Sequence, residues 1–177
     1  MTDLVEILAA TPWLLATCTF VLSLLVGSFL NVVIHRVPIM LEREWRAQAR
    51  EMIVEPGQTD DDGTVEVRTD VRLERYNLLV PRSRCPSCNA EITALQNIPV
   101  ISWLLLGGKC ASCRTSISVR YPIVEFATAV LSTVVVLHFG WHWQTLAALL
   151  FTWALISLTV IDLDHTLLPD VITIPLL

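Results

Sequence analysis

The stretch PWLLATCTFVLSLLVGSFLNVVI, residues Pro12–Ile34, decides the class of fold that this chain adopts. It contains no Lys, Arg, Asp or Glu, and about 20 such residues in a helix cross the hydrocarbon core of a bilayer. The composition agrees, because 54% of the 177 residues are hydrophobic and the mean hydropathy is +0.60. We therefore predict a membrane protein. A cleaved signal peptide is disfavoured, because the chain starts with Asp3 and Glu6 and the apolar run is too long.

Two further apolar stretches follow the first one. They are residues Pro122–His138 and Trp143–Ile161, and the link FGWHWQ between them is short, uncharged and rich in tryptophan. Such a link is typical of a hairpin at the membrane interface. The sequence thus predicts an all-α polytopic membrane protein with three antiparallel spans.

The basic residues predict how the chain is oriented. All 12 Lys and Arg lie between Arg36 and Arg120, and basic residues next to spans stay on the cytoplasmic side. We expect residues 1–35 to form the first transmembrane helix with its N-terminus outside, and residues 36–120 to form a cytoplasmic domain. Residues 121–177 would form two more transmembrane helices and the beginning of another. The bilayer is the expected partner, and we expect no nucleic acid.

The polar domain contains three predicted elements. Residues Ile39–Ile53 are predicted to form an amphipathic helix in which Glu42 pairs with Arg46 at i,i+4. The acidic EPGQTDDDG, residues 55–63, predicts a turn or flexible loop. The alternating TVEVRTDVRL, residues 64–73, predicts a strand or hairpin arm.

A pair of Cys-x-x-Cys motifs gives the strongest chemical signal in this domain. They are CPSC at 85–88 and CASC at 110–113, and 21 residues separate them. Four thiolates at about 2.3 Å can surround a zinc ion tetrahedrally and leave no open position for water, so such a site is structural. The spacing is slightly above the usual range of about 15–20 residues. Two disulfides or a redox pair are alternatives, which a cytoplasmic location disfavours. We expect Cys18, in the first span, to serve packing against lipid or another helix only.

Polar residues inside the spans are the next candidates. Gly27, Asn31 and His35 recur at i,i+4, and Ser28 lies on the same sector of the helix. Packing between helices and participation in a site both remain open. Glu125 is an isolated acid in the second span, where a carboxylate is costly, faces the interior in most cases and is a functional candidate. A snorkelling or salt-bridged surface carboxylate is the alternative.

The stretch IDLDHTLLPD, residues 161–170, places three aspartates where the third span ends. Asp162 follows the apolar run directly, Asp164 is about 200° further round a helix, and Pro169 is expected to break the helix. Paired carboxylates could activate water, with one acid kept neutral by partial burial. A divalent metal on Asp162, Asp164 and His165, a proton or cation relay, and a plain polar cap at the membrane boundary are the other hypotheses.

Together, VGSFLNVVIHRVP (26–38), CPSC…CASC, RYPIVEFATA (120–129) and IDLDHTLLPD resemble the bacterial type IV prepilin leader peptidases, in order and spacing, along essentially the whole chain. The resemblance implies an aspartic protease of the bacterial inner membrane. It would remove the leader peptide of prepilins and pseudopilins at the cytoplasmic face and N-methylate the new N-terminus with S-adenosylmethionine. It implies that Asp162 is the first catalytic aspartate and that Cys85, Cys88, Cys110 and Cys113 bind zinc.

One feature of the family pattern has no counterpart here. The family's second aspartate lies in a Gly-x-Gly-Asp motif on a later span, and this sequence has no such motif. We therefore expect residues 1–177 to be an N-terminal portion without peptidase activity of its own. No glycine-rich motif predicts where S-adenosylmethionine would bind. A metal-binding membrane transporter and a non-catalytic assembly subunit remain the alternatives from other functional classes.

Overall fold

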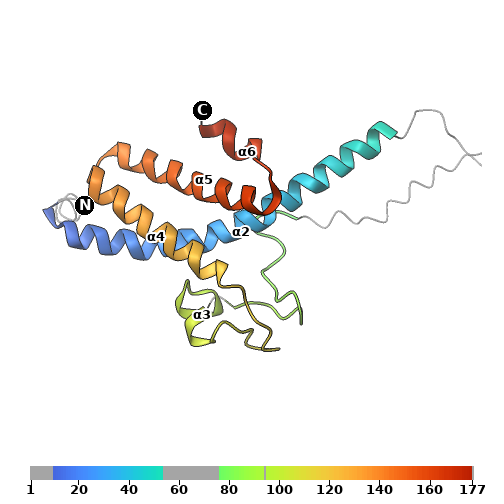
Figure 1. The fold of residues 1–177 in the computed structure, drawn as a ribbon, viewed down its shortest axis with the longest axis horizontal. Coiled ribbons are helices and arrows are strands. Elements are labelled where there is room, and N and C mark those ends of the chain that lie inside the picture. Colours follow the sequence, from blue (N-terminus) through green and yellow to red (C-terminus); the bar gives the residue numbers. More distant parts are fainter. Residues whose placement is uncertain (1–9, 54–75, 94, 177) are drawn as a thin grey trace, which may run out of the picture.

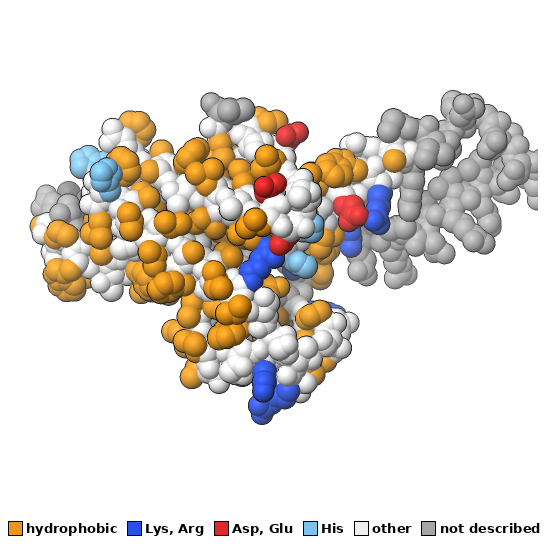
Figure 2. Space-filling model, in the orientation of Figure 1, with side chains coloured by type: hydrophobic (Ala, Val, Ile, Leu, Met, Phe, Trp, Pro, Cys, Tyr) orange, Lys and Arg blue, Asp and Glu red, His pale blue; other side chains and the backbone are white. Residues whose placement is uncertain are grey.

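Three long helices dominate the computed structural model, which describes residues 10–53, 76–93 and 95–176 (Figure 1). They are α2 (Pro12–Ile53), α4 (Arg120–Phe139) and α5 (Trp143–His165). Each is long and apolar enough to cross a membrane, which confirms the three predicted spans. The visible face of this bundle is covered by hydrophobic side chains, and the charged ones lie at one end of it or beyond (Figure 2).

Helix α2 is much longer than a membrane span. Its 42 residues correspond to about 63 Å, roughly twice the hydrocarbon core of a bilayer. The predicted helix at Ile39–Ile53 is present, but it is continuous with the first span through Pro38. Proline removes one helical hydrogen bond, and the strong helix formers of LEREWRAQA that follow it sustain the helix. The predicted Glu42–Arg46 pair is confirmed, at 2.5 Å.

Helices α2 and α4 cross in close contact at Gly27. A Cβ atom at this position would lie 2.7 Å from the Cα of Glu125, so only glycine allows this approach. One helical turn further along α2, the side-chain amide of Asn31 donates to the carbonyl of Tyr121 at 3.1 Å. Small and amide side chains are the usual means by which membrane helices approach each other. The buried hydrophobic core beside the crossing consists of Leu30, Ile34, Val124 and Ile161.

Helices α4 and α5 form a hairpin that turns at Gly140, which has a φ of 68°. Along the hairpin, the Trp153 indole donates to the Ser132 hydroxyl at 2.9 Å. At its open end, Arg120 donates to Asp164 at 2.6 Å. The antiparallel path therefore brings the start of α4 and the end of α5 together, next to Asn31 of α2.

Helix α5 ends at His165, four residues before the break that was predicted at Pro169. The prediction was wrong because Thr166 adopts a left-handed conformation, with φ 49° and ψ 42°, and its N–H donates to the Asp162 carbonyl at 2.8 Å. A residue in this conformation is a common way to end a helix. The chain then forms α6 (Asp170–Thr173) and the short 3₁₀ turn η2 (Ile174–Leu176).

Residues 76–119 form a small lobe beside the bundle, which we call the cysteine lobe (Figure 1). It contains the 3₁₀ turn η1 (Leu95–Asn97), helix α3 (Ile101–Leu105) and two isolated bridges. The described residues contain no strand. The predicted loop at 55–63 and strand at 64–73 lie outside the described residues. Arg36 of α2 holds the start of the lobe by donating to the carbonyls of Asn77 and Pro81, at 2.7 and 2.5 Å.

Candidate functional site

The two Cys-x-x-Cys motifs fold into two turns of the same geometry. In each turn, the N–H of the first cysteine donates to the carbonyl five residues later, and the residue after the second cysteine donates back to the first. These bonds are Cys85–Ala90 and Asn89–Cys85, both 2.9 Å, and Cys110–Thr115 and Arg114–Cys110, at 2.8 and 3.0 Å. Asn89 and Arg114 both have a φ near 60°. The internal repeat in the sequence is therefore also a repeat in the structure.

These turns bring the four cysteines to one point. Their Sγ atoms all lie within 4.8 Å of one another, and Cys85 and Cys113 are 3.7 Å apart at sulfur. Tetrahedral zinc with Zn–S bonds of about 2.3 Å requires sulfurs about 3.8 Å apart. None of the cysteines is in a disulfide. The four residues are thus close enough to bind a metal ion, as predicted.

The surroundings favour thiolates at two of these cysteines. The backbone N–H groups of Cys88 and Ser87 lower the pKa of Cys85. The hydroxyl and the N–H of Thr115 lower the pKa of Cys113 to about 6. At Cys88 the N–H of Ala90 also favours the thiolate, but the other sulfurs oppose it, Cys113 most strongly, and raise the pKa to about 11. Only a bound cation would keep all four cysteines as thiolates this close together.

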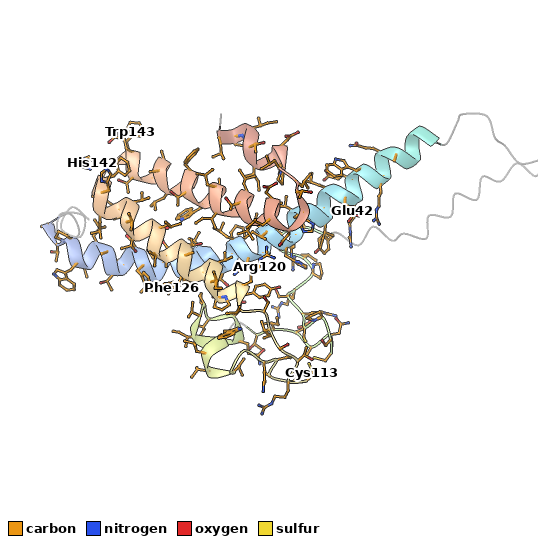
Figure 3. All side chains as sticks on the ribbon, in the orientation of Figure 1. Glu42, Cys113, Arg120, Phe126, His142 and Trp143 are labelled. Carbon is orange, nitrogen blue, oxygen red and sulfur yellow. The ribbon has the colours of Figure 1, made fainter. Side chains whose placement is uncertain are left out.

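A second group of polar residues lies at the end of the helix bundle that is next to the cysteine lobe. It lines a pocket of about 140 Å³ between α2, α4 and α5, and Figure 3 shows Arg120 at this junction. The lining residues are Asn31, Ile34, His35, Ser118, Arg120, Tyr121, Asp164 and His165. Of the residues that the sequence singled out, the structure brings Asn31, His35, Asp164 and His165 together here. Arg120 was considered only for its charge, and its ion pair with Asp164 was missed because the partners are 44 residues apart.

Asp162 lies outside this pocket, on the last turn of α5. Its side chain is exposed, so the partial burial that a carboxyl pair would provide is not observed for this residue. Asp164, two residues later on the same helix, is held by Arg120. Asp170 is exposed at the start of α6. Asp162 is thus an accessible acid at the lobe end of a membrane-spanning helix.

Glu125 faces the interior of the protein. It is buried on α4 with an exposed fraction of 8%, and its Oε2 accepts a hydrogen bond from the backbone N–H of Val100 at 2.7 Å. Ser28 and Asn31 of α2 lie near its carboxyl. Of the two sequence hypotheses, the interior-facing one is confirmed. The partner is the backbone of the cysteine lobe, which no sequence pattern indicated.

Comparison with known families decides what kind of chain this is. The family model described as the bacterial peptidase A24 N-terminal domain matches residues 21–139. That range contains the α2–α4 crossing, Glu125 and all four lobe cysteines. The chain belongs to the bacterial peptidase A24 family.

Curated A24 relatives carry the name prepilin leader peptidase/N-methyltransferase. The one from Aeromonas salmonicida (strain A449) is 54% identical over 100% of this chain and 57% of its own length. The one from Aeromonas hydrophila is 53% identical with the same coverage. The one from Pseudomonas aeruginosa is 50% identical over 98% of this chain and 56% of its own length. The chain thus spans somewhat more than half of these relatives. No solved structure matches it.

Proposed function

We propose that this chain contributes the N-terminal domain and the first catalytic aspartate of a membrane aspartic endopeptidase that removes the leader of type IV prepilins and pseudopilins. One observation carries the proposal. An accessible aspartate, Asp162, lies on the last turn of an apolar helix long enough to cross a membrane, in a chain that is 50–54% identical to relatives named prepilin leader peptidase/N-methyltransferase. Those relatives also support the proposal that the whole protein N-methylates the new N-terminus.

The orientation follows from the basic residues. Arg36 and Arg120 flank the spans at the end where the lobe lies, so that end faces the cytoplasm of a bacterial inner membrane. A prepilin leader precedes an apolar helix, and its cleavage point is where that helix leaves the bilayer. Asp162 stands at the same level and is exposed, so a substrate helix lying beside α5 can reach it.

The chemistry requires a second carboxyl group beside Asp162. One carboxylate takes a proton from water as the water attacks the peptide carbonyl, and one neutral carboxyl protonates the departing amine. Asp164 is held by Arg120 and Glu125 by Val100, so neither pairs with Asp162. We infer that the second acid comes from beyond the described ranges, as the Gly-x-Gly-Asp motif of the family implies.

Zinc fits the four-cysteine site and would have a structural role there. Cys85, Cys88, Cys110 and Cys113 supply four sulfurs within 4.8 Å of one another, and the Cys85–Cys113 pair, at 3.7 Å, is close to the separation of about 3.8 Å that tetrahedral zinc requires. A bound ion would neutralise their charge and hold the two turns of the lobe together. S-adenosylmethionine would supply the methyl group, and we assign it no residues. The pocket beside Arg120, at about 140 Å³, is small for a ligand of that size.

Neither alternative gains support from the geometry. A transporter would need Asp162, Asp164 and His165 as a ligand set. Among the described residues, only the four cysteines form a group that could hold a metal ion. A non-catalytic assembly subunit would use the lobe as a docking surface and would not depend on Asp162.

A chimera tests the proposal directly. Residues 1–177 replace the matching stretch of the Aeromonas hydrophila relative, which is 53% identical over this length. The chimera is expressed in a bacterium that lacks its own prepilin peptidase. We expect the leader to be removed from a prepilin, as seen by a mobility shift and by mass spectrometry of the new N-terminus. A stable, membrane-inserted chimera that leaves the prepilin uncut would contradict the proposal.

A further inference from the structure

The part of the lobe between the two cysteine turns is unusually apolar. Residues 92–108 contain no Asp, Glu, Lys or Arg. Within them, helix α3 exposes Ile101, Leu104 and Leu105, with exposed fractions of 54%, 64% and 82%. The charged residues of the lobe instead lie on and beside the cysteine turns. They are Arg82, Arg84, Glu91, Lys109 and Arg114.

The exposed side of α3 is continuous with an exposed apolar side of α4. An apolar groove of about 340 Å³ runs between them, lined from α3 by Trp103 and Leu104 and from α4 by Ile123 and Phe126. Ile123 and Phe126 are themselves exposed, at 57% and 54%. In Figure 3 Phe126 lies on the part of α4 next to α3, and Cys113 lies on the other side of the lobe.

The position of the groove along α4 indicates how deep the groove lies in the bilayer. The 20 residues of α4 span about 30 Å, the thickness of the hydrocarbon core, so Arg120 marks its edge. Ile123 and Phe126 then lie about 4.5 and 9 Å inside that edge. The N–H of Val100, which precedes α3, bonds to Glu125, about 7.5 Å inside. Helix α3 therefore begins at the depth of acyl chains.

The two polar side chains of α3 both bond within the protein, which favours a place in hydrocarbon. The Ser102 hydroxyl donates to the Gln96 carbonyl at 2.5 Å, and the Trp103 indole donates to the Ile117 carbonyl at 3.2 Å. The Trp103 ring also packs directly on Gly108, where a Cβ would lie 2.8 Å from it. Both ends of α3 are thus fixed, and its apolar side chains are presented outward.

We propose that α3 inserts into the bilayer leaflet on the lobe side, and that a lipid acyl chain fills the groove between α3 and α4. The cysteine lobe is then held flat against the membrane, with its two cysteine turns facing water. This contact would fix how far the lobe lies from the membrane and from the pocket beside Arg120. It depends on the membrane location of the chain and not on the peptidase activity.

Photolabelling from within the bilayer tests this proposal. The protein is reconstituted in phosphatidylethanolamine–phosphatidylglycerol vesicles that contain a phospholipid with a diazirine on an acyl-chain carbon near the glycerol. Adducts are mapped by mass spectrometry. We expect adducts on Leu104 and Leu105 at a yield comparable to Ile123. Adducts on Ile123 with none on α3 would overturn the proposal. Adducts on α3 that disappear when a prepilin helix is added would also overturn it, in favour of a peptide groove.

Leu79 is the matched control for Leu105. Its exposed fraction is 81%, but the carbonyls on either side of it are held by Arg36. Asn31 bonds to Tyr121, so these two residues lie at the same level, near the edge of the hydrocarbon core. Arg36 lies about 7.5 Å further along α2, outside that edge. Leu79, which Arg36 holds, is therefore on the water side. We expect no adducts on Leu79. Leu105→Glu should abolish the α3 adducts while the metal content stays unchanged, and Leu79→Glu should leave them intact. Persistent α3 adducts in Leu105→Glu would contradict the assignment.

Discussion

Glu125 illustrates how a carboxyl group is accommodated inside a membrane helix. The sequence identified it as an exposed ion-pair residue or an interior-facing functional one, because an acid in a span is costly without a partner. The structure gives it the N–H of Val100 at 2.7 Å and places Ser28 and Asn31 beside it. Its partner could not be predicted, because Val100 belongs to a lobe whose path depends on tertiary contacts. We infer that Glu125 joins the lobe to the helices.

Replacing Glu125 tests this role. Glu125→Ala should leave the Val100 N–H without an acceptor in a buried place, which costs about 1–3 kcal/mol. Glu125→Gln keeps an oxygen that can accept and should retain most of the stability. Hydrogen exchange of a peptide containing Val100 should speed up in the alanine variant and much less in the glutamine variant. Equal acceleration in both variants would show that the charge matters and the hydrogen bond does not.

Gly27 is the other residue whose role depends on a contact distance. The sequence placed Gly27, Asn31 and His35 on one helical sector. In the structure, Gly27 and Asn31 contact α4, and His35 lines the pocket beside Arg120. Gly27→Ala should push Cβ into the Glu125 backbone and destabilise the α2–α4 crossing by about 1–3 kcal/mol. Val21→Leu also adds one carbon to α2, but on an exposed side chain, and should have little effect. Thermal unfolding in detergent measures both, and equal midpoints would refute the close crossing.

At the scale of elements, the open end of the α4–α5 hairpin is closed by Arg120 and Asp164. Both side chains are partly exposed, at 42% and 32%, so we expect their coupling to contribute at most about 1 kcal/mol. A double-mutant cycle with Arg120→Ala and Asp164→Ala, followed by unfolding, measures this coupling. It should decrease as salt is raised. A coupling of zero at low salt would mean that the pair does not join these helices.

The two cysteine turns are an element whose geometry the sequence did predict. The two Cys-x-x-Cys motifs indicated four convergent sulfurs, and the inferred cytoplasmic location disfavoured the alternative of disulfides. We expect the purified protein to contain one zinc ion per chain, and a strong chelator to remove it. Cys85→Ser should lower the zinc content and the thermal stability. Cys18→Ser changes the one cysteine outside the cluster and should change neither. Equal zinc content in both variants would refute the site.

At the scale of the whole molecule, hydropathy predicted the three spans and charge separated the lobe from them. These patterns are local and strong, because a bilayer requires long uninterrupted apolar runs. Hydropathy and charge did not predict that α2 continues through Pro38, because proline is expected to break a helix. The end of α5 was also misplaced, because the left-handed Thr166 carries no sequence signal as strong as Pro169. The placement of α3 beside α4 depends on contacts between residues far apart in the chain.

Asp162 is the residue that we propose as a catalytic acid where α5 leaves the membrane. The most direct measurement is prepilin cleavage by the chimera with Asp162→Asn, compared with Asp170→Asn. Both changes replace an exposed acid at the lobe end of the bundle and remove one charge without changing size. We predict that Asp162→Asn abolishes leader removal while membrane insertion and zinc content stay unchanged, and that Asp170→Asn retains cleavage. Undiminished cleavage by the Asp162→Asn chimera would show that Asp162 is not a catalytic acid.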